Sequence, residues 1–173
     1  MLRCGPSDQA FAALSRSSSP RLDFGLNSLS RSFSHNPIKE NILSLPSFHM
    51  IDAAPQPVAT FSHAAEIDGW VFLTGQMPTW PGEPDRPLPE GVTAQTRRVM
   101  DNLILVLDGM CLGIENVVQA RIYLTEFERD YADMNLSYKS YFEEGKLPAR
   151  TCIGVTALAV GALVEIDVIA KRP

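Results

Sequence analysis

The fold is decided by the stretch that reads LPARTCIGVTALAVGALVEIDVIAK, residues 147–171. Its two ends, 149–155 and 162–170, alternate apolar side chains with polar or small ones and therefore predict two β-strands. Residues 156–161 connect them. Strands that bury one apolar face need a second layer to pack on, so the stretch predicts a sheet within a layered domain.

The alternation also indicates which side chains share a face. It groups Arg150 with Cys152 and separates Glu165 from the apolar row of Val164 and Val168. We expect Arg150 and Glu165 on the face away from the most apolar row. The two can form a structural ion pair that neutralises both charges. Alternatively, Arg150 binds a substrate carboxylate and Glu165 handles a proton or a water.

The preceding chain supplies the other elements of the domain. Periodicity, turn residues and cap residues predict a hairpin of two strands, a helix, a third strand and a second helix, at 58–63, 70–74, 93–111, 117–124 and from Asp130 onward. The order β-β-α-β-α-β-β predicts an α+β domain with both helices on one face of the sheet. The other face needs cover, and self-association is the simplest source of it.

Residues 1–49 differ from the rest of the chain. They contain eight serines between positions 15 and 34, more basic than acidic side chains, and no sustained apolar period. Such a segment cannot bury enough surface to offset its chain entropy. We expect an N-terminal extension, either transit-like or non-structural, followed by the folded domain at 50–173.

The composition excludes several functions. A net charge of −5 and a pI near 5.2 argue against nucleic-acid binding. No run of eighteen apolar residues occurs, so no membrane contact is expected. Histidines and cysteines lack metal-ligand spacing, and phosphate-binding glycine loops are missing, so neither a metal nor a cofactor is expected. Three widely spaced cysteines fit a reducing compartment, hence the cytoplasm, or an organelle matrix if 1–49 is a transit peptide.

Several single residues have two interpretations. Cys152 is either a thiolate activated by Arg150 or a small buried hydrophobe, and His63 is its one candidate base within the domain. Thr74 and Gly75 either offer a hydroxyl and backbone N–H groups to a ligand or end a strand. Asn135 is by default a surface residue of the second helix.

Between about residues 57 and 170 the sequence resembles the RidA (YjgF) family of enamine/imine deaminases. The resemblance is carried by FLTGQMP at 72–78, by QTR at 95–97 through Asn102 and Leu103, by LPARTC at 147–152 and by GALVEI at 161–166. It implies a chorismate-mutase-like α+β fold and a homotrimer with ligand clefts between subunits.

The resemblance also implies roles for individual residues. Arg150 would clamp the substrate carboxylate, backbone near Cys152 would position the amino group or water, and Glu165 would position the hydrolytic water. Thr74, just before Gly75, and Asn135 would complete the substrate-binding set.

One segment departs from the family pattern. Phe61 stands where the family often has a tyrosine that faces the site, and His63 replaces a glutamine. The resemblance implies hydrolysis of 2-enamino or 2-imino acids such as 2-aminoacrylate to 2-keto acids and ammonia, without a cofactor. Phe61 leaves two alternatives open: a non-catalytic trimer that binds small carboxylates or acts as a chaperone-like or regulatory protein, and a 2-aminomuconate-type deaminase.

Overall fold

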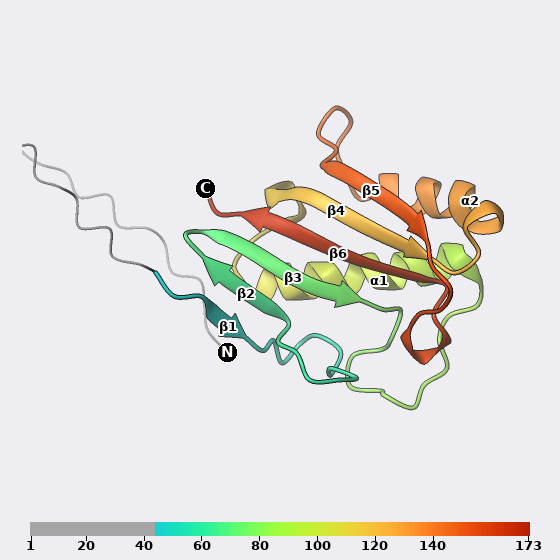
Figure 1. The fold of residues 1–173 in the computed structure, drawn as a ribbon, viewed down its shortest axis with the longest axis horizontal. Coiled ribbons are helices and arrows are strands. Elements are labelled where there is room, and N and C mark those ends of the chain that lie inside the picture. The colour runs from blue at the N-terminus through green and yellow to red at the C-terminus, as the bar shows by residue number, and fades with distance from the viewer. Residues whose placement is uncertain (1–43) are drawn as a thin grey trace, which may run out of the picture. The chain divides into compact units, whose positions relative to one another are not determined.

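A mixed β-sheet organises the part of the chain that the computed structural model describes, residues 44–173 (Figure 1). Expectations about residues 1–43 lie outside the described residues. The strands follow the order β1-β2-β3-β6-β4-β5, and only β4 and β5 run parallel. Their bounds are β1 Ser47–His49, β2 Ala64–Ile67, β3 Trp70–Gln76, β4 Val117–Leu124, β5 Ala149–Gly154 and β6 Val164–Lys171.

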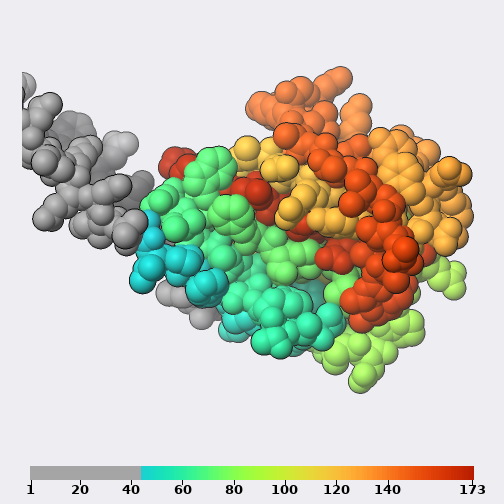
Figure 2. Space-filling view, viewed as in Figure 1, coloured from blue at the N-terminus to red at the C-terminus, as the bar shows by residue number. Residues whose placement is uncertain are grey.

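Two helices, α1 (Gly91–Gly109) and α2 (Phe127–Lys139), cover one face of this sheet, and in Figure 1 they lie behind the strands. The α1 stripe predicted from its spacing is buried in the core: Val99, Leu103, Val106, Leu107 and Met110. The predicted α+β class with both helices on one face is therefore confirmed. Figure 2 shows the other face, where no helix covers the strands.

The last two strands of the chain are not neighbours. β4 lies between β5 and β6, pairing parallel with β5 and antiparallel with β6. A parallel pair requires a crossover connection, and α2 supplies it between β4 and β5. The central position of β4 explains why its alternate residues Ala120, Ile122 and Leu124 are fully buried.

The strand expected at 58–63 is wrong, because that segment has no regular structure and the strand β2 follows it directly. The reason lies in the turn at Asp68 and Gly69, which have φ values of 51° and 73°. Two consecutive positive φ angles are typical of a two-residue hairpin turn. This turn pairs Ile67 with Trp70 and so fixes the first strand next to it.

Element ends also differ slightly from expectation. α1 begins at Gly91 rather than near position 93, and α2 begins at Phe127, which places Asp130 inside the helix. Asp130 is buried and accepts two hydrogen bonds from Arg129 instead of capping the helix. Ser47–His49, expected in the extension, forms the edge strand β1 and pairs with β2.

The proline-rich loop after β3 is held by a buried amide. Asn102 of α1 is fully buried, and its Nδ2 donates to the carbonyl oxygens of Met77 and Thr79, both at 2.9 Å. Its Oδ1 accepts from Nε of Arg98 at 3.1 Å. Prolines cannot provide a regular hydrogen-bond ladder, so this side chain satisfies the loop backbone in its place.

Asn102→Ala should therefore destabilise the domain by about 3 kcal/mol, because a buried and a half-buried carbonyl lose their donor. Chemical denaturation measures the change in the free energy of unfolding. Asp108→Ala, an exposed position of the same helix, is the matched control and should change it by less than about 0.5 kcal/mol. Equal effects of the two substitutions would contradict the anchoring role of Asn102.

Candidate functional site

Arg150 projects from β5 toward the helix layer. Its register partner on β4 is the fully buried Ala120, so both lie on the helix-covered face. Nη1 of Arg150 donates to Oδ1 of Asn135 at 2.5 Å, and Nη2 lies 3.5 Å from the hydroxyl of Tyr131. The guanidinium carbon lies 5.2 Å from the ring centroid of Tyr138. Three α2 side chains thus fix the orientation of the guanidinium group.

A cleft of about 380 Å³ opens beside this guanidinium, and we call it the Arg150 cleft. Its lining residues are Asn135, Tyr138, Lys139, Leu147, Pro148 and Arg150. Within residues 44–173 no carboxylate lies within ion-pair distance of Arg150. A guanidinium oriented by neutral partners and facing an open cleft is suited to bind a carboxylate in bidentate fashion.

Cys152 lies two residues further along β5, on the same face as Arg150. Burial raises the pKa of its thiol, and the charge of Arg150 offsets only part of that effect. Its predicted candidate base is not available, because both ring nitrogens of His63 bond to backbone: Nδ1 accepts from Ile51 N at 2.8 Å, and Nε2 lies 3.0 Å from the Pro55 carbonyl. Cys152 is therefore a neutral, half-buried thiol rather than an activated nucleophile.

Glu165 projects from β6 to the face without helices. Its register partner is Tyr123, while the flanking residues Val164 and Ile166 are buried under the helices. Burial raises the pKa of the Glu165 carboxyl, and the like charge of Asp167 raises it further. A carboxylate with increased proton affinity is suited to accept a proton from water.

A β-bulge in β3 brings Gly75 next to this carboxylate. Leu73 pairs with Val168 and Gln76 with Ile166, so Thr74 and Gly75 together face the single residue Asp167. A Cβ atom on Gly75 would overlap Oε1 of Glu165 and lie 2.8 Å from its Cδ. The glycine thus makes room for the carboxylate against the β3 backbone.

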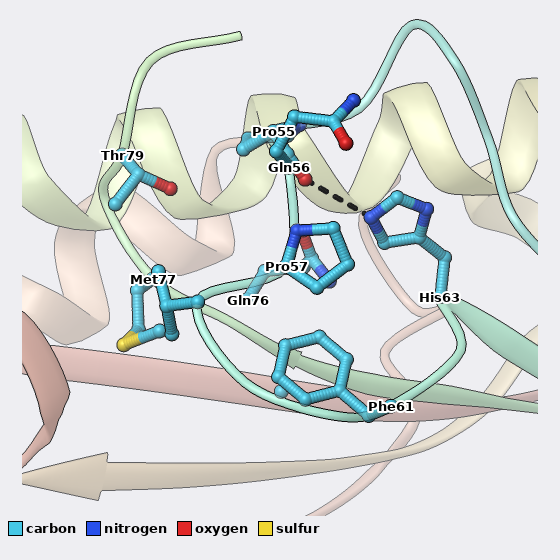
Figure 3. Close-up of a pocket in the computed structure, with 10 residues that line it drawn as sticks. Pro55, Gln56, Pro57, Phe61, His63, Gln76, Met77 and Thr79 are labelled. Atoms are coloured by element: carbon cyan, nitrogen blue, oxygen red, sulfur yellow. Dashed lines mark hydrogen bonds between the residues drawn. The ribbon is translucent and has the colours of Figure 1, made fainter. Parts of the chain in front are cut away.

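Phe61 lies near the same bulge. It lines a small, partly open cavity of about 10 Å³ together with Gly75, Gln76 and Pro57 (Figure 3). This volume has room for about one water. The dashed line in Figure 3 marks the bond between His63 and Pro55 that holds the loop over this cavity. Gly75 thus adjoins both the Glu165 carboxylate and the cavity that Phe61 lines, and we call Phe61, Thr74, Gly75 and Glu165 the Glu165 group.

The expectation that Arg150 and Glu165 share a face is wrong, and so is the alternative ion pair between them. Because β4 separates β5 from β6, Arg150 falls in the register of buried Ala120, and Glu165 falls in that of Tyr123. Consecutive residues of a strand point to opposite faces. Arg150 with Asn135 and Cys152 therefore lies on one side of the sheet, and the Glu165 group lies on the other.

Sequence reasoning missed Tyr131 and Tyr138. Both share a helix face with Asn135, because the three residues are spaced at i, i+4 and i+7. The spacing around Asn135 could therefore have identified them. The neighbours of Glu165 on β4, Arg121 and Tyr123, had no comparable signal, because only the strand register brings them to the carboxylate.

The chain is similar to several known proteins in sequence and fold. The family model described as endoribonuclease L-PSP matches residues 51–172. Protein HMF1 of Saccharomyces cerevisiae is 35% identical over 122 residues, covering 70% of this chain and 91% of that protein. The 2-iminobutanoate/2-iminopropanoate deaminase of Mus musculus is 32% identical, covering 69% and 86%. The crystal structure of E. coli TdcF with bound serine superposes with a TM-score of 0.67 at 25% identity, covering 73% and 99%.

Gly75→Ala should destabilise the domain by about 1 kcal/mol, because the added methyl group displaces the Glu165 carboxylate, which is the flexible end of its side chain. The cost should fall to less than half in a Glu165→Ala background, where the overlapping atoms are gone. A double-mutant cycle of unfolding free energies measures this coupling. Equal costs in both backgrounds would contradict the close approach of Gly75 and Glu165.

Proposed function

The chain belongs to the endoribonuclease L-PSP family, which is the RidA (YjgF) family that its signature segments predict, and we propose that it hydrolyses short 2-imino and 2-enamino acids. The products would be a 2-keto acid and ammonia. The observation that carries the proposal is Arg150, whose guanidinium is oriented by Asn135 and faces an open cleft. Within the part of the chain that the structure describes, it has no carboxylate partner.

In the proposed reaction Arg150 binds the substrate carboxylate and thereby fixes the adjacent imine carbon. Glu165 accepts a proton from a water whose oxygen bonds to that carbon, while the C=N electrons move to nitrogen, which takes up a proton. The amino group of the resulting carbinolamine then takes the proton held by Glu165. Ammonia leaves with the C–N electrons, while the hydroxyl group loses its proton to water and becomes the keto oxygen. Such imines also hydrolyse without a catalyst, so the acceleration required is modest.

Arg150 and Glu165 lie on opposite faces of one sheet, so one small substrate cannot contact both within a subunit. We expect the site to combine the Arg150 cleft of one copy with the Glu165 group of another, in the homotrimer that the family resemblance implies. The helix-free face supports association, because an apolar row crosses four paired strands on it: Phe48, Ala65, Phe72 and Ile169. Phe48 and Phe72 are 68% and 44% exposed in the single chain. A second copy would bury them.

The names of the relatives are compatible with a small amino-acid-like substrate. One curated relative is an iminobutanoate and iminopropanoate deaminase, and the TdcF structure holds serine. Both ligand types carry a carboxylate next to a nitrogen-bearing carbon. The Arg150 cleft offers a cation to the carboxylate.

A non-catalytic carboxylate-binding trimer is the second candidate. Phe61 favours it, because this residue brings no hydroxyl to the Glu165 group. The two candidates separate in one assay. An amino-acid oxidase generates the imine, and the protein either shortens its lifetime or binds a 2-keto acid without changing that lifetime.

Arg150→Ala should abolish the acceleration of imine hydrolysis while the domain stays folded, because the substrate loses its clamp. Trapping with semicarbazide measures the imine that remains at each time point. Arg97→Ala, an exposed arginine of α1, is the matched control and should keep the wild-type rate. Full activity of Arg150→Ala would exclude the carboxylate clamp.

The catalysed rate should fall as the pH drops through the raised pKa of Glu165, above the ordinary carboxyl range near 4.5. The reason is that burial, followed by the charge of Asp167, favours the protonated acid, which cannot accept a proton. Imine decay is followed by absorbance across this range, with the enzyme-free rate subtracted. Glu165→Gln should lose the pH-dependent component. A wild-type rate that stays constant down to pH 4.5 would contradict this role.

A further inference from the structure

Three polar side chains form a cluster beside Glu165 on the helix-free face. Nε of Arg121 donates to Oδ1 of Asp167 at 2.8 Å, and the Tyr123 hydroxyl donates to Oδ2 at 3.1 Å. Asp167 is only 8% exposed, whereas the Arg121 side chain is 53% exposed. Both oxygens of a nearly buried carboxylate are thus occupied by β4 donors.

The strand register ties this cluster to the carboxylate of the Glu165 group. Arg121 pairs with Asp167, and Tyr123 pairs directly with Glu165. Asp167 follows Glu165 by two residues on β6, so both project from the same face. Burial and then the charge of Asp167 raise the pKa of Glu165. Burial and then the hydrogen bond to Asp167 raise the pKa of the Tyr123 hydroxyl, and the charge of Glu165 adds to them.

Among the described residues, the strands next to Glu165 carry one cation on this face, which is Arg121. β6 contributes Asp167, β4 contributes Tyr123 and Arg121, and the β3 bulge contributes Thr74 and Gly75, which carry no charge. Without Arg121, two carboxylates would stand next to each other uncompensated. Like charges at this separation disfavour simultaneous ionisation.

We propose that Arg121 and Tyr123 neutralise and orient Asp167 so that Glu165 beside it can ionise, which makes Arg121 and Asp167 positioning residues for the proton-accepting step. The role in the proton-accepting step rests on the proposed function. The effect of Arg121 and Asp167 on the ionisation of Glu165 rests on the geometry alone. A half-exposed ion pair adds little to folding stability, so the field at Glu165 is its larger effect.

Removing the charge of Arg121 and removing the charge of Asp167 should shift the acid limb of the pH profile in opposite directions. Arg121→Gln leaves Asp167 uncompensated and should shift the limb upward by about half a pH unit or more. Asp167→Asn should shift it downward. The KM should stay within about twofold, because Arg121 and Asp167 pair with each other and neither residue is the proposed clamp of the substrate carboxylate.

Two control variants make the comparison specific. Arg121→Lys keeps the charge and should retain most of the wild-type profile. Arg129→Gln removes an arginine from another ion pair, with Asp130, and should leave the profile unchanged. Identical profiles for wild type, Arg121→Gln and Asp167→Asn would overturn the proposal, as would an equal loss of rate at every pH.

A direct titration keeps the inference testable even if the wild-type protein does not accelerate imine hydrolysis, a result that would refute the proposed function alone. The side-chain carboxyl of Glu165, labelled with ¹³C and assigned through Glu165→Gln, is titrated by NMR in the same variants. The pKa of Glu165 should rise in Arg121→Gln and fall in Asp167→Asn. An unchanged pKa in both would refute the electrostatic role.

Discussion

The antiparallel pairing of β4 with β6 is the constraint on which the rest of the structure depends. It inserts β4 between the two strands that carry the signature residues, and it buries Ala120, Ile122 and Leu124 against the helices. Because strand faces alternate, this insertion directs Arg150 to the helix layer and Glu165 to the opposite side. One sheet thereby presents Arg150 on one face and Glu165 on the other, and neither face carries both residues.

Each set has a chemistry of its own. On the helix side, Asn135 and two tyrosines orient a guanidinium for an anion. On the other side, a bulge makes room for a half-buried carboxylate with increased proton affinity. Two features fit this division. Arg150 has no carboxylate partner among residues 44–173, and the apolar row with Phe48 and Phe72 is exposed on the helix-free face. A second copy of the chain would satisfy both.

Sequence patterns predicted what is local and missed what depends on register. The spacing of Val99, Leu103 and Met110 located α1, and alternation correctly grouped Arg150 with Cys152. Alternation fixes faces within one strand, however, and cannot relate two strands whose order is unknown, so Arg150 and Glu165 were assigned to one face. The same limit hid the Arg121–Asp167 pair. Three-residue β1 is too short to produce a pattern.

In the proposed reaction, each site takes Arg150 from one subunit and Glu165 from another. Co-expression of Arg150→Ala with Glu165→Gln tests it most directly, because each variant alone lacks one half of every site. Random assembly would give about a quarter of the sites both intact residues, so about a quarter of wild-type activity should return. Mixed assemblies that stay inactive, while wild type is active, would contradict a shared site.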